Sequence, residues 1–79
     1  MKEKITKYIL EEILGNPEEE LLPDDDLLNS GMIDSLGIMR VISFIEGEYD
    51  MKVPPQDMVI ENFISVSAIA AYIQKVKST

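Results

Sequence analysis

Apolar residues recur at helical spacing in three segments of this chain, at about residues 2–14, 35–49 and 65–76. Spacings of three and four residues place such side chains on one face of an α-helix, where they can be buried together. The recurring positions are Ile5, Tyr8, Ile9 and Ile13; Leu36, Met39, Ile42, Ile45 and Tyr49; and Val66, Ile69, Ala70, Ile73 and Val76, and those of the last segment are expected to face inward. No segment alternates apolar and polar residues between hairpin turns, as half-buried strands do. The pattern predicts an all-α fold.

Helix breakers and caps mark the ends of these segments. Gly15 is expected to end the first helix, and Pro54 with Pro55 breaks the pattern after the second. Ser65 is the expected N-cap of the last helix, because its side chain can accept a hydrogen bond from the first turn. Residues 56–61 can form one short helix. We therefore expect a four-helix bundle with three longer helices, one short third helix, and a long loop between helices one and two.

The second segment is apolar over more than half of its circumference, because Ile38, Val41 and Phe44 lie beside its main apolar face. Such a helix is either central to the bundle or partly open to a partner. The twenty residues before it show no long periodic pattern, which is unusual in so small a domain. The pairs Leu21-Leu22 and Leu27-Leu28 are expected to hold this loop against the core.

The size and the residue types limit what the chain can do. Seventy-nine residues, 46% of them hydrophobic, make one domain (residues 1–79), which we expect to be a monomer. With no cysteine and no histidine, the chain lacks the usual nucleophile, the usual general base and the commonest zinc ligands. No signal peptide or membrane-spanning run is present, so the sequence predicts a soluble, cytoplasmic protein that does not insert into membranes.

The net charge of −8 is distributed unevenly along the chain. No basic residue lies between Lys7 and Arg40, whereas that stretch holds nine acidic residues. Such a surface repels nucleic acid and anionic membranes, so no nucleic-acid partner is expected. It attracts basic patches on partner proteins, but acidity also keeps small proteins soluble, and charge alone does not separate these interpretations.

Ser35 stands where a polar loop turns into the most apolar helix, in the string Gly31-Met32-Ile33-Asp34-Ser35-Leu36-Gly37. Asp34 and Ser35 both suit a helix N-cap, so a capping role explains the pair without any further function. In a chain with so little catalytic equipment, an exposed serine at a helix start also suits covalent modification. The residues alone leave both interpretations open.

The context of Asp34-Ser35-Leu36 resembles the acyl carrier protein family over nearly the whole chain. A helix and a long acidic loop precede the motif, residues 46–50 close the second helix, and residues 66–73 are similar to the family's last helix. The resemblance implies a non-catalytic carrier with 4′-phosphopantetheine attached covalently to Ser35, and an acyl or aminoacyl group held on that arm as a thioester. It implies three kinds of partner: a phosphopantetheinyl transferase, an acyl-loading ligase or acyltransferase, and a downstream synthase or transferase.

The residues after Ser35 depart from the pattern of fatty-acid carriers, in which acidic residues follow the serine and meet basic partner enzymes. Gly37 and Arg40 occupy those positions here, and the sequence equally allows Arg40 to be an ordinary solvated residue. This departure is similar to specialised carriers, such as D-alanyl carriers and carriers served by a dedicated adenylate-forming ligase. Met32, Leu36 and Met39 are expected to flank the arm. The full predicted set for the motif and for partner recognition is Met32, Asp34, Leu36, Gly37, Met39 and Arg40.

Other classes of function fit the sequence less well. An enzyme would need a pocket built on carboxylates alone. A calcium loop beginning at Asp24 fails, because its sixth position is Asn29 where glycine is required. The stronger alternative is an unmodified acidic helical adaptor that binds a basic protein, which would share the fold and differ only at Ser35.

Overall fold

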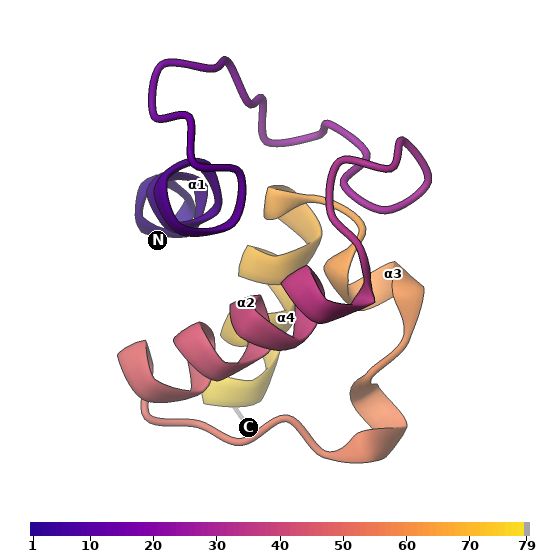
Figure 1. Cartoon of the computed structure of the whole chain (residues 1–79). Coiled ribbons are helices and arrows are strands. Elements are labelled where there is room, and N and C mark those ends of the chain that lie inside the picture. Colours follow the sequence, from indigo (N-terminus) through magenta and orange to yellow (C-terminus); the bar gives the residue numbers. More distant parts are fainter. Residues whose placement is uncertain (79) are drawn as a thin grey trace.

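The computed structural model describes residues 1–78, and all of the regular secondary structure among these residues is helical, with no strand (Figure 1). Four α-helices are joined by one π-helical and one 3₁₀ segment. In chain order the elements are α1 (Lys2–Tyr8), η1 (Ile9–Ile13), α2 (Ser35–Glu48), η2 (Pro55–Asp57), α3 (Ile60–Phe63) and α4 (Val66–Lys77). The predicted all-α bundle, with three longer helices and a short third one, is confirmed.

The first helix forms as its apolar spacing predicts, and η1 continues α1 without a break. Ile5 and Ile9 are fully buried on its inner face. The helix ends at Gly15, which adopts a φ of +67°, a left-handed conformation that glycine takes without steric cost. The N–H of Asn16 then closes the end by donating to the carbonyl of Leu10 over 2.8 Å.

The core joins all four α-helices and the long loop in one cluster of buried side chains. Its largest fully buried members are Ile5, Ile9, Leu27, Val41, Ile45, Phe63, Val66, Ile69 and Ile73. The first helix packs against both α2 and α4. Between α1 and α2 the rings of Tyr8 and Phe44 stack with centroids 4.2 Å apart. None of the described helices has the length and apolar character needed to cross a membrane.

The loop between the first helix and α2 is held to the core by side chains and to the rest of the fold by backbone hydrogen bonds. Leu21 and Leu27 are buried as predicted, whereas Leu22 is exposed, so one leucine of that first pair is enough. The Leu27 N–H donates to the carbonyl of Ile64 over 2.7 Å. The carbonyl of Pro23 accepts from the N–H of Ser67 over 2.9 Å. The loop therefore supplies a hydrogen-bond acceptor to the first turn of α4, where the N–H groups have no partner within the helix.

Within the loop, Asp26 organises the turn that leads toward α2. Its carboxylate accepts hydrogen bonds from the N–H groups of Asn29 (2.8 Å) and Leu28 (3.1 Å). These bonds, that from Asn29 above all, hold the pKa of the Asp26 carboxyl below its usual value. The turn is thus stabilised by the charged form of one side chain.

Our prediction of a single short helix over residues 56–61 is wrong. The chain forms η2, then leaves the helical conformation at Met58 and Val59, and starts α3 at Ile60. Val59 is extended, with φ −114° and ψ 155°, as a β-branched residue prefers. The side-chain amide of Asn62, in α3, donates to the carbonyl of Asp57 over 2.8 Å, and this hydrogen bond spans the bend.

A side-chain hydrogen bond attaches η2 to α4. The Tyr72 hydroxyl donates to the Asp57 carboxylate over 2.8 Å, and the Tyr72 ring lies against Phe63 with centroids 5.6 Å apart. Burial of the phenol, followed by its hydrogen bond to Asp57, raises the pKa of Tyr72 to about 12. Ser65 caps α4 as predicted, accepting from the Ala68 N–H over 3.0 Å.

We expect Tyr72→Phe to lower the free energy of unfolding at neutral pH by about 1.5 kcal/mol, because a hydrogen bond to a carboxylate is lost. The folded pKa of Tyr72 is about 12 against an ordinary value of 10.0, so the neutral phenol contributes fully below pH 10. That contribution is lost as the pH rises toward 12. Urea unfolding of both proteins should therefore show a difference that shrinks above pH 10. A difference independent of pH over this range would contradict the assigned hydrogen bond.

Candidate functional site at the start of α2

Ser35 is the first residue of α2, and Asp34 is the N-cap of that helix. The Asp34 carboxylate accepts from the N–H of Gly37 over 2.8 Å. The Ser35 side chain is exposed, and its hydroxyl makes no hydrogen bond with residues 1–78. Because Asp34 caps the helix, the structure decides which residue of the pair has the capping role and leaves the Ser35 hydroxyl free.

The backbone around Ser35 suits a phosphate ester. The first N–H groups of a helix have no partner within the helix, and here the Asp34 carboxylate takes only that of Gly37. The N–H groups of Ser35 and Leu36 have no such partner among residues 1–78, and they lie at the positive end of the helix dipole. A negative charge at such an exposed position is stabilised by about 0.3–1 kcal/mol. The residues present thus fit a phosphodiester attached at this oxygen.

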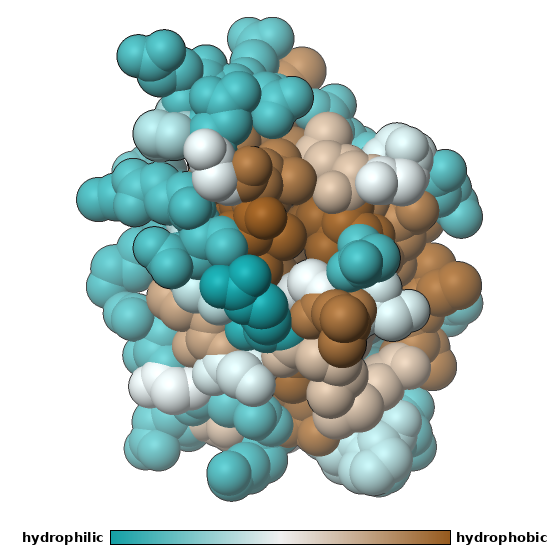
Figure 2. Space-filling model, in the orientation of Figure 1, coloured by the Kyte–Doolittle hydropathy of each residue, from teal (hydrophilic) through white to brown (hydrophobic). Residues whose placement is uncertain are grey.

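An apolar cleft of ≈ 520 Å³ opens next to Ser35, between α2 and the segment that carries α3. Its lining includes the buried Ile42 and Phe63. The exposed side chains of the bend complete the lining on the other side: Met58, Val59 and Ile60. Figure 2 shows apolar surface (brown) over α3 and beside the start of α2.

Sequence reasoning did not include Met58, Val59 and Ile60 in the site, because it placed them in a short amphipathic helix. The signal that could have found them is the run of three apolar residues that follows two prolines and precedes Glu61. A one-turn helix cannot bury three consecutive apolar side chains on one face. Some of the three must therefore be exposed.

Gly37 lies buried under the first turn of α2, where two other segments meet the helix. A Cβ at this position would lie 2.6 Å from Cγ2 of Ile33 and 3.3 Å from Cγ2 of Ile13. Glycine is therefore what allows the loop and the first helix to approach α2 this closely. The residue that the sequence suggested for partner recognition fixes the start of the helix that presents Ser35.

Leu36 and Met39 share the helical spacing of Ile42 and Ile45, but they do not lie in the core. They are 76% and 50% exposed, and the buried side of α2 consists of Gly37, Val41, Ile42 and Ile45. The helix is apolar nearly all round, and the placement of the first helix and the loop decides which side is covered. Arg40 is exposed beside Met39, whereas Met32 is half-buried and packs against the core.

Comparison with known proteins identifies the family of this chain. Residues 5–73 match a family model described as the phosphopantetheine attachment site, which includes Ser35 and all of α2. The chain belongs to this family of phosphopantetheine-binding carrier proteins. Its prosthetic group is a covalently attached 4′-phosphopantetheine.

Relatives along nearly the full chain support this family. The D-alanyl carrier protein of Lactococcus lactis subsp. lactis is 35% identical over 77 residues, which are 98% of this carrier and 96% of the relative. The meromycolate extension acyl carrier protein of Mycolicibacterium smegmatis is 30% identical over 69 residues, which are 87% of this carrier and 68% of the relative.

A solved structure shares the fold. A chain in a crystal structure described as that of an FAD-dependent dehydrogenase superposes with a TM-score of 0.78 and 28% identity. The match covers 86% of this carrier and 96% of that chain, so the two chains are of similar length.

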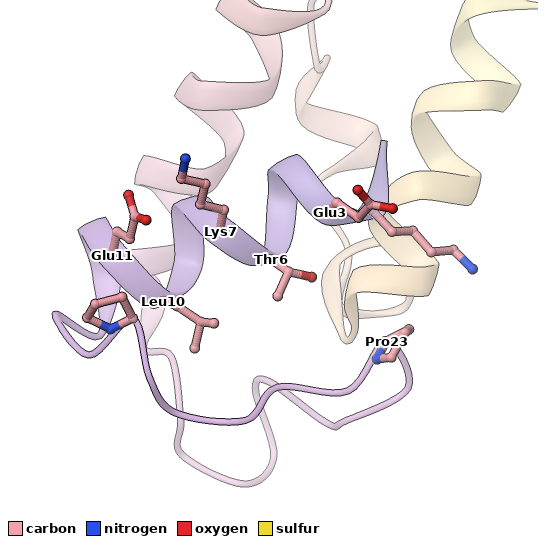
Figure 3. A pocket seen from close by; sticks show the side chains of 8 residues that line it. Glu3, Thr6, Lys7, Leu10, Glu11 and Pro23 are labelled. Carbon is pink, nitrogen blue, oxygen red and sulfur yellow. The ribbon is translucent and has the colours of Figure 1, made fainter.

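A further hollow of ≈ 360 Å³ lies between the first helix and the loop. Figure 3 shows Thr6 and Leu10 pointing from this helix toward the loop segment that carries Pro23. None of the residues predicted for the site lines it. Within residues 1–78 no group of three or more carboxylate, histidine or cysteine side chains is placed to hold a metal ion.

We expect Gly37→Ala to lower the free energy of unfolding by about 1–3 kcal/mol, because the new methyl group overlaps Ile33 and this outweighs alanine's better helix propensity. Gly47 is the matched control, since α2 leaves open space around it. Gly47→Ala should raise stability by up to about 1 kcal/mol. Thermal and urea unfolding of the two variants measures both values. Equal stabilisation by both substitutions would contradict the close approach at Gly37.

Proposed function

We propose that Ser35 is the residue that carries the 4′-phosphopantetheine arm. The observation that carries this proposal is the free, exposed Ser35 hydroxyl at the start of a helix that Asp34 caps. A transferase must bring this oxygen to the phosphate of coenzyme A, so the hydroxyl has to project clear of the bundle. The unpaired N–H groups of the first turn would then stabilise the negative charge of the phosphodiester that the reaction forms on Ser35.

In this proposal the carrier has no catalysis of its own and works as a cytoplasmic monomer. The phosphopantetheinyl transferase modifies it, a ligase or acyltransferase loads the arm, and a synthase or transferase takes the cargo. Leu36, Met39 and Arg40 meet these enzymes, because they are exposed within two turns of Ser35. Asp34 and Gly37 act by fixing the first turn, and Met32 supports the loop just before it.

We further propose that a dedicated ligase loads the carrier with an amino acid or a related small acid. This is supported by the similarity to D-alanyl carrier proteins and by the absence of any acidic residue in α2 before Glu46. Fatty-acid partners with basic contact surfaces would find Arg40 where they need a carboxylate.

Modification of Ser35 is tested by intact mass. Purified apo-protein is incubated with coenzyme A and a broad-specificity phosphopantetheinyl transferase, and wild type should gain one phosphopantetheine. Ser35→Ala should gain none. Ser43→Ala, which changes another exposed serine of α2, should be modified like wild type. An unmodified wild type would favour the alternative, an acidic helical adaptor.

The loading enzyme is tested on the modified carrier. We expect a D-alanine-activating ligase to load it with a kcat/KM at least about tenfold above that of a fatty-acid malonyl transferase, because specificity is a difference between two interaction energies. Thioester formation is followed by intact mass under initial-rate conditions. Efficient malonyl loading, with turnover by a fatty-acid synthase, would contradict the proposed pathway.

A further inference from the structure

A second hollow lies on the face of α2 next to the apolar cleft, and it also includes Tyr8 of the first helix. We call it the Arg40 hollow; it measures ≈ 640 Å³ and is lined by Tyr8, Leu36, Met39, Arg40, Ser43 and Phe44. The stacked rings of Tyr8 and Phe44 form part of its surface, with an angle of 16° between their planes. The Tyr8 hydroxyl donates to the Arg40 carbonyl over 3.4 Å, which ties the ring pair to the same turn of α2.

The charge in this hollow is opposite to that of the molecule. The carrier has a net charge of −8, yet none of the residues that line the Arg40 hollow is acidic. The Arg40 guanidinium makes no ion pair or side-chain hydrogen bond with residues 1–78, whereas Lys4 is paired with Glu48 over 2.7 Å. An exposed guanidinium without a partner, beside exposed apolar side chains, is free to bind a carboxylate through two parallel hydrogen bonds.

An adjoining hollow beyond the aromatic pair does contain carboxylates. Glu11, Glu12 and Glu48 line it together with Lys4 and Lys7, and the two hollows share Tyr8 and Phe44. The ring pair therefore separates a mixed-charge surface from one that carries Arg40 alone.

The Arg40 hollow is also continuous with the surface around Ser35. Leu36 follows Ser35 directly, and Met39 lines both the Arg40 hollow and the apolar cleft. Five residues of helix place Arg40 about 7.5 Å from Ser35 along the axis of α2. An enzyme that docks on the start of α2 beside Ser35 can therefore contact the Arg40 hollow in the same complex.

We infer that the loading ligase docks on the Arg40 hollow with an acidic side chain beside an apolar one, the carboxylate on Arg40 and the apolar group against Leu36 and Met39. This inference rests on the proposed function and specifies the chemistry of the partner's contact surface. A basic contact surface would place a cation against Arg40, and the two like charges would repel each other.

The test uses the full-length carrier in its modified form and a D-alanine-activating ligase as the probe. We compare wild type, R40E, R40Q and the charge-matched control K52E, which reverses an exposed lysine in the segment after α2. At low ionic strength R40E should lower kcat/KM for loading about tenfold and R40Q less, whereas K52E should stay within about twofold of wild type. Salt should lower the wild-type value and reduce the difference between wild type and R40E.

Several results would overturn the inference. Unchanged or faster loading of R40E, or an equal loss in K52E, would each do so and leave the proposed ligase in place. No loading of the modified wild type would overturn both the proposed ligase and this inference. Salt-dependent self-association of the carrier that R40E abolishes, measured by sedimentation equilibrium, would assign the Arg40 hollow to a second copy instead. Modification of wild type but not of Ser35→Ala is established first, so these outcomes stay separate from failure of the proposed attachment site.

Discussion

The start of α2 depends on one hydrogen bond, from the Gly37 N–H to the Asp34 carboxylate. Because this bond completes the first turn, the Ser35 hydroxyl is not needed as a cap. The same glycine lets Ile33 and Ile13 pack against the turn, so the direction of the helix is fixed where its first side chains emerge. Ser35 is thus exposed because Asp34 caps the helix and because Gly37 lets the neighbouring segments pack against its first turn.

The long loop connects the start of α2 to the rest of the bundle through buried side chains and hydrogen bonds. It buries Leu21, Leu27 and Ile33 in the core and forms backbone hydrogen bonds with Ile64, between α3 and α4, and with Ser67 in the first turn of α4. The residue before Asp34 therefore belongs to the same packed unit as Phe63. This connection holds the start of α2 opposite the bend at Met58 and Val59, and the apolar cleft is the space left between them.

The sequence predicted the features that local chemistry decides. Gly15 ends the first helix and Ser65 caps the last, because their conformations and hydrogen bonds involve residues within a few positions. The exposure of Leu36 could not be predicted in this way. α2 is apolar nearly all round, and only the packing of distant segments selects its buried side. Gly37 is similar: its role depends on Ile13, which is 24 positions away in the chain (37 minus 13).

The two sides of α2 differ in how they can contribute to recognition. Charges on the loop act over about 10 Å at moderate salt, so they influence which surfaces approach but not which residue meets Arg40. Asp34 is the only charged residue among those that line the apolar cleft, which otherwise offers polar and apolar contact area. The Arg40 hollow combines a cation with apolar side chains on the adjacent face of α2. Met39 lines both, so a partner's position on one side restricts its position on the other. An ion pair between a partner's carboxylate and Arg40 would therefore also fix the orientation of that partner relative to Ser35.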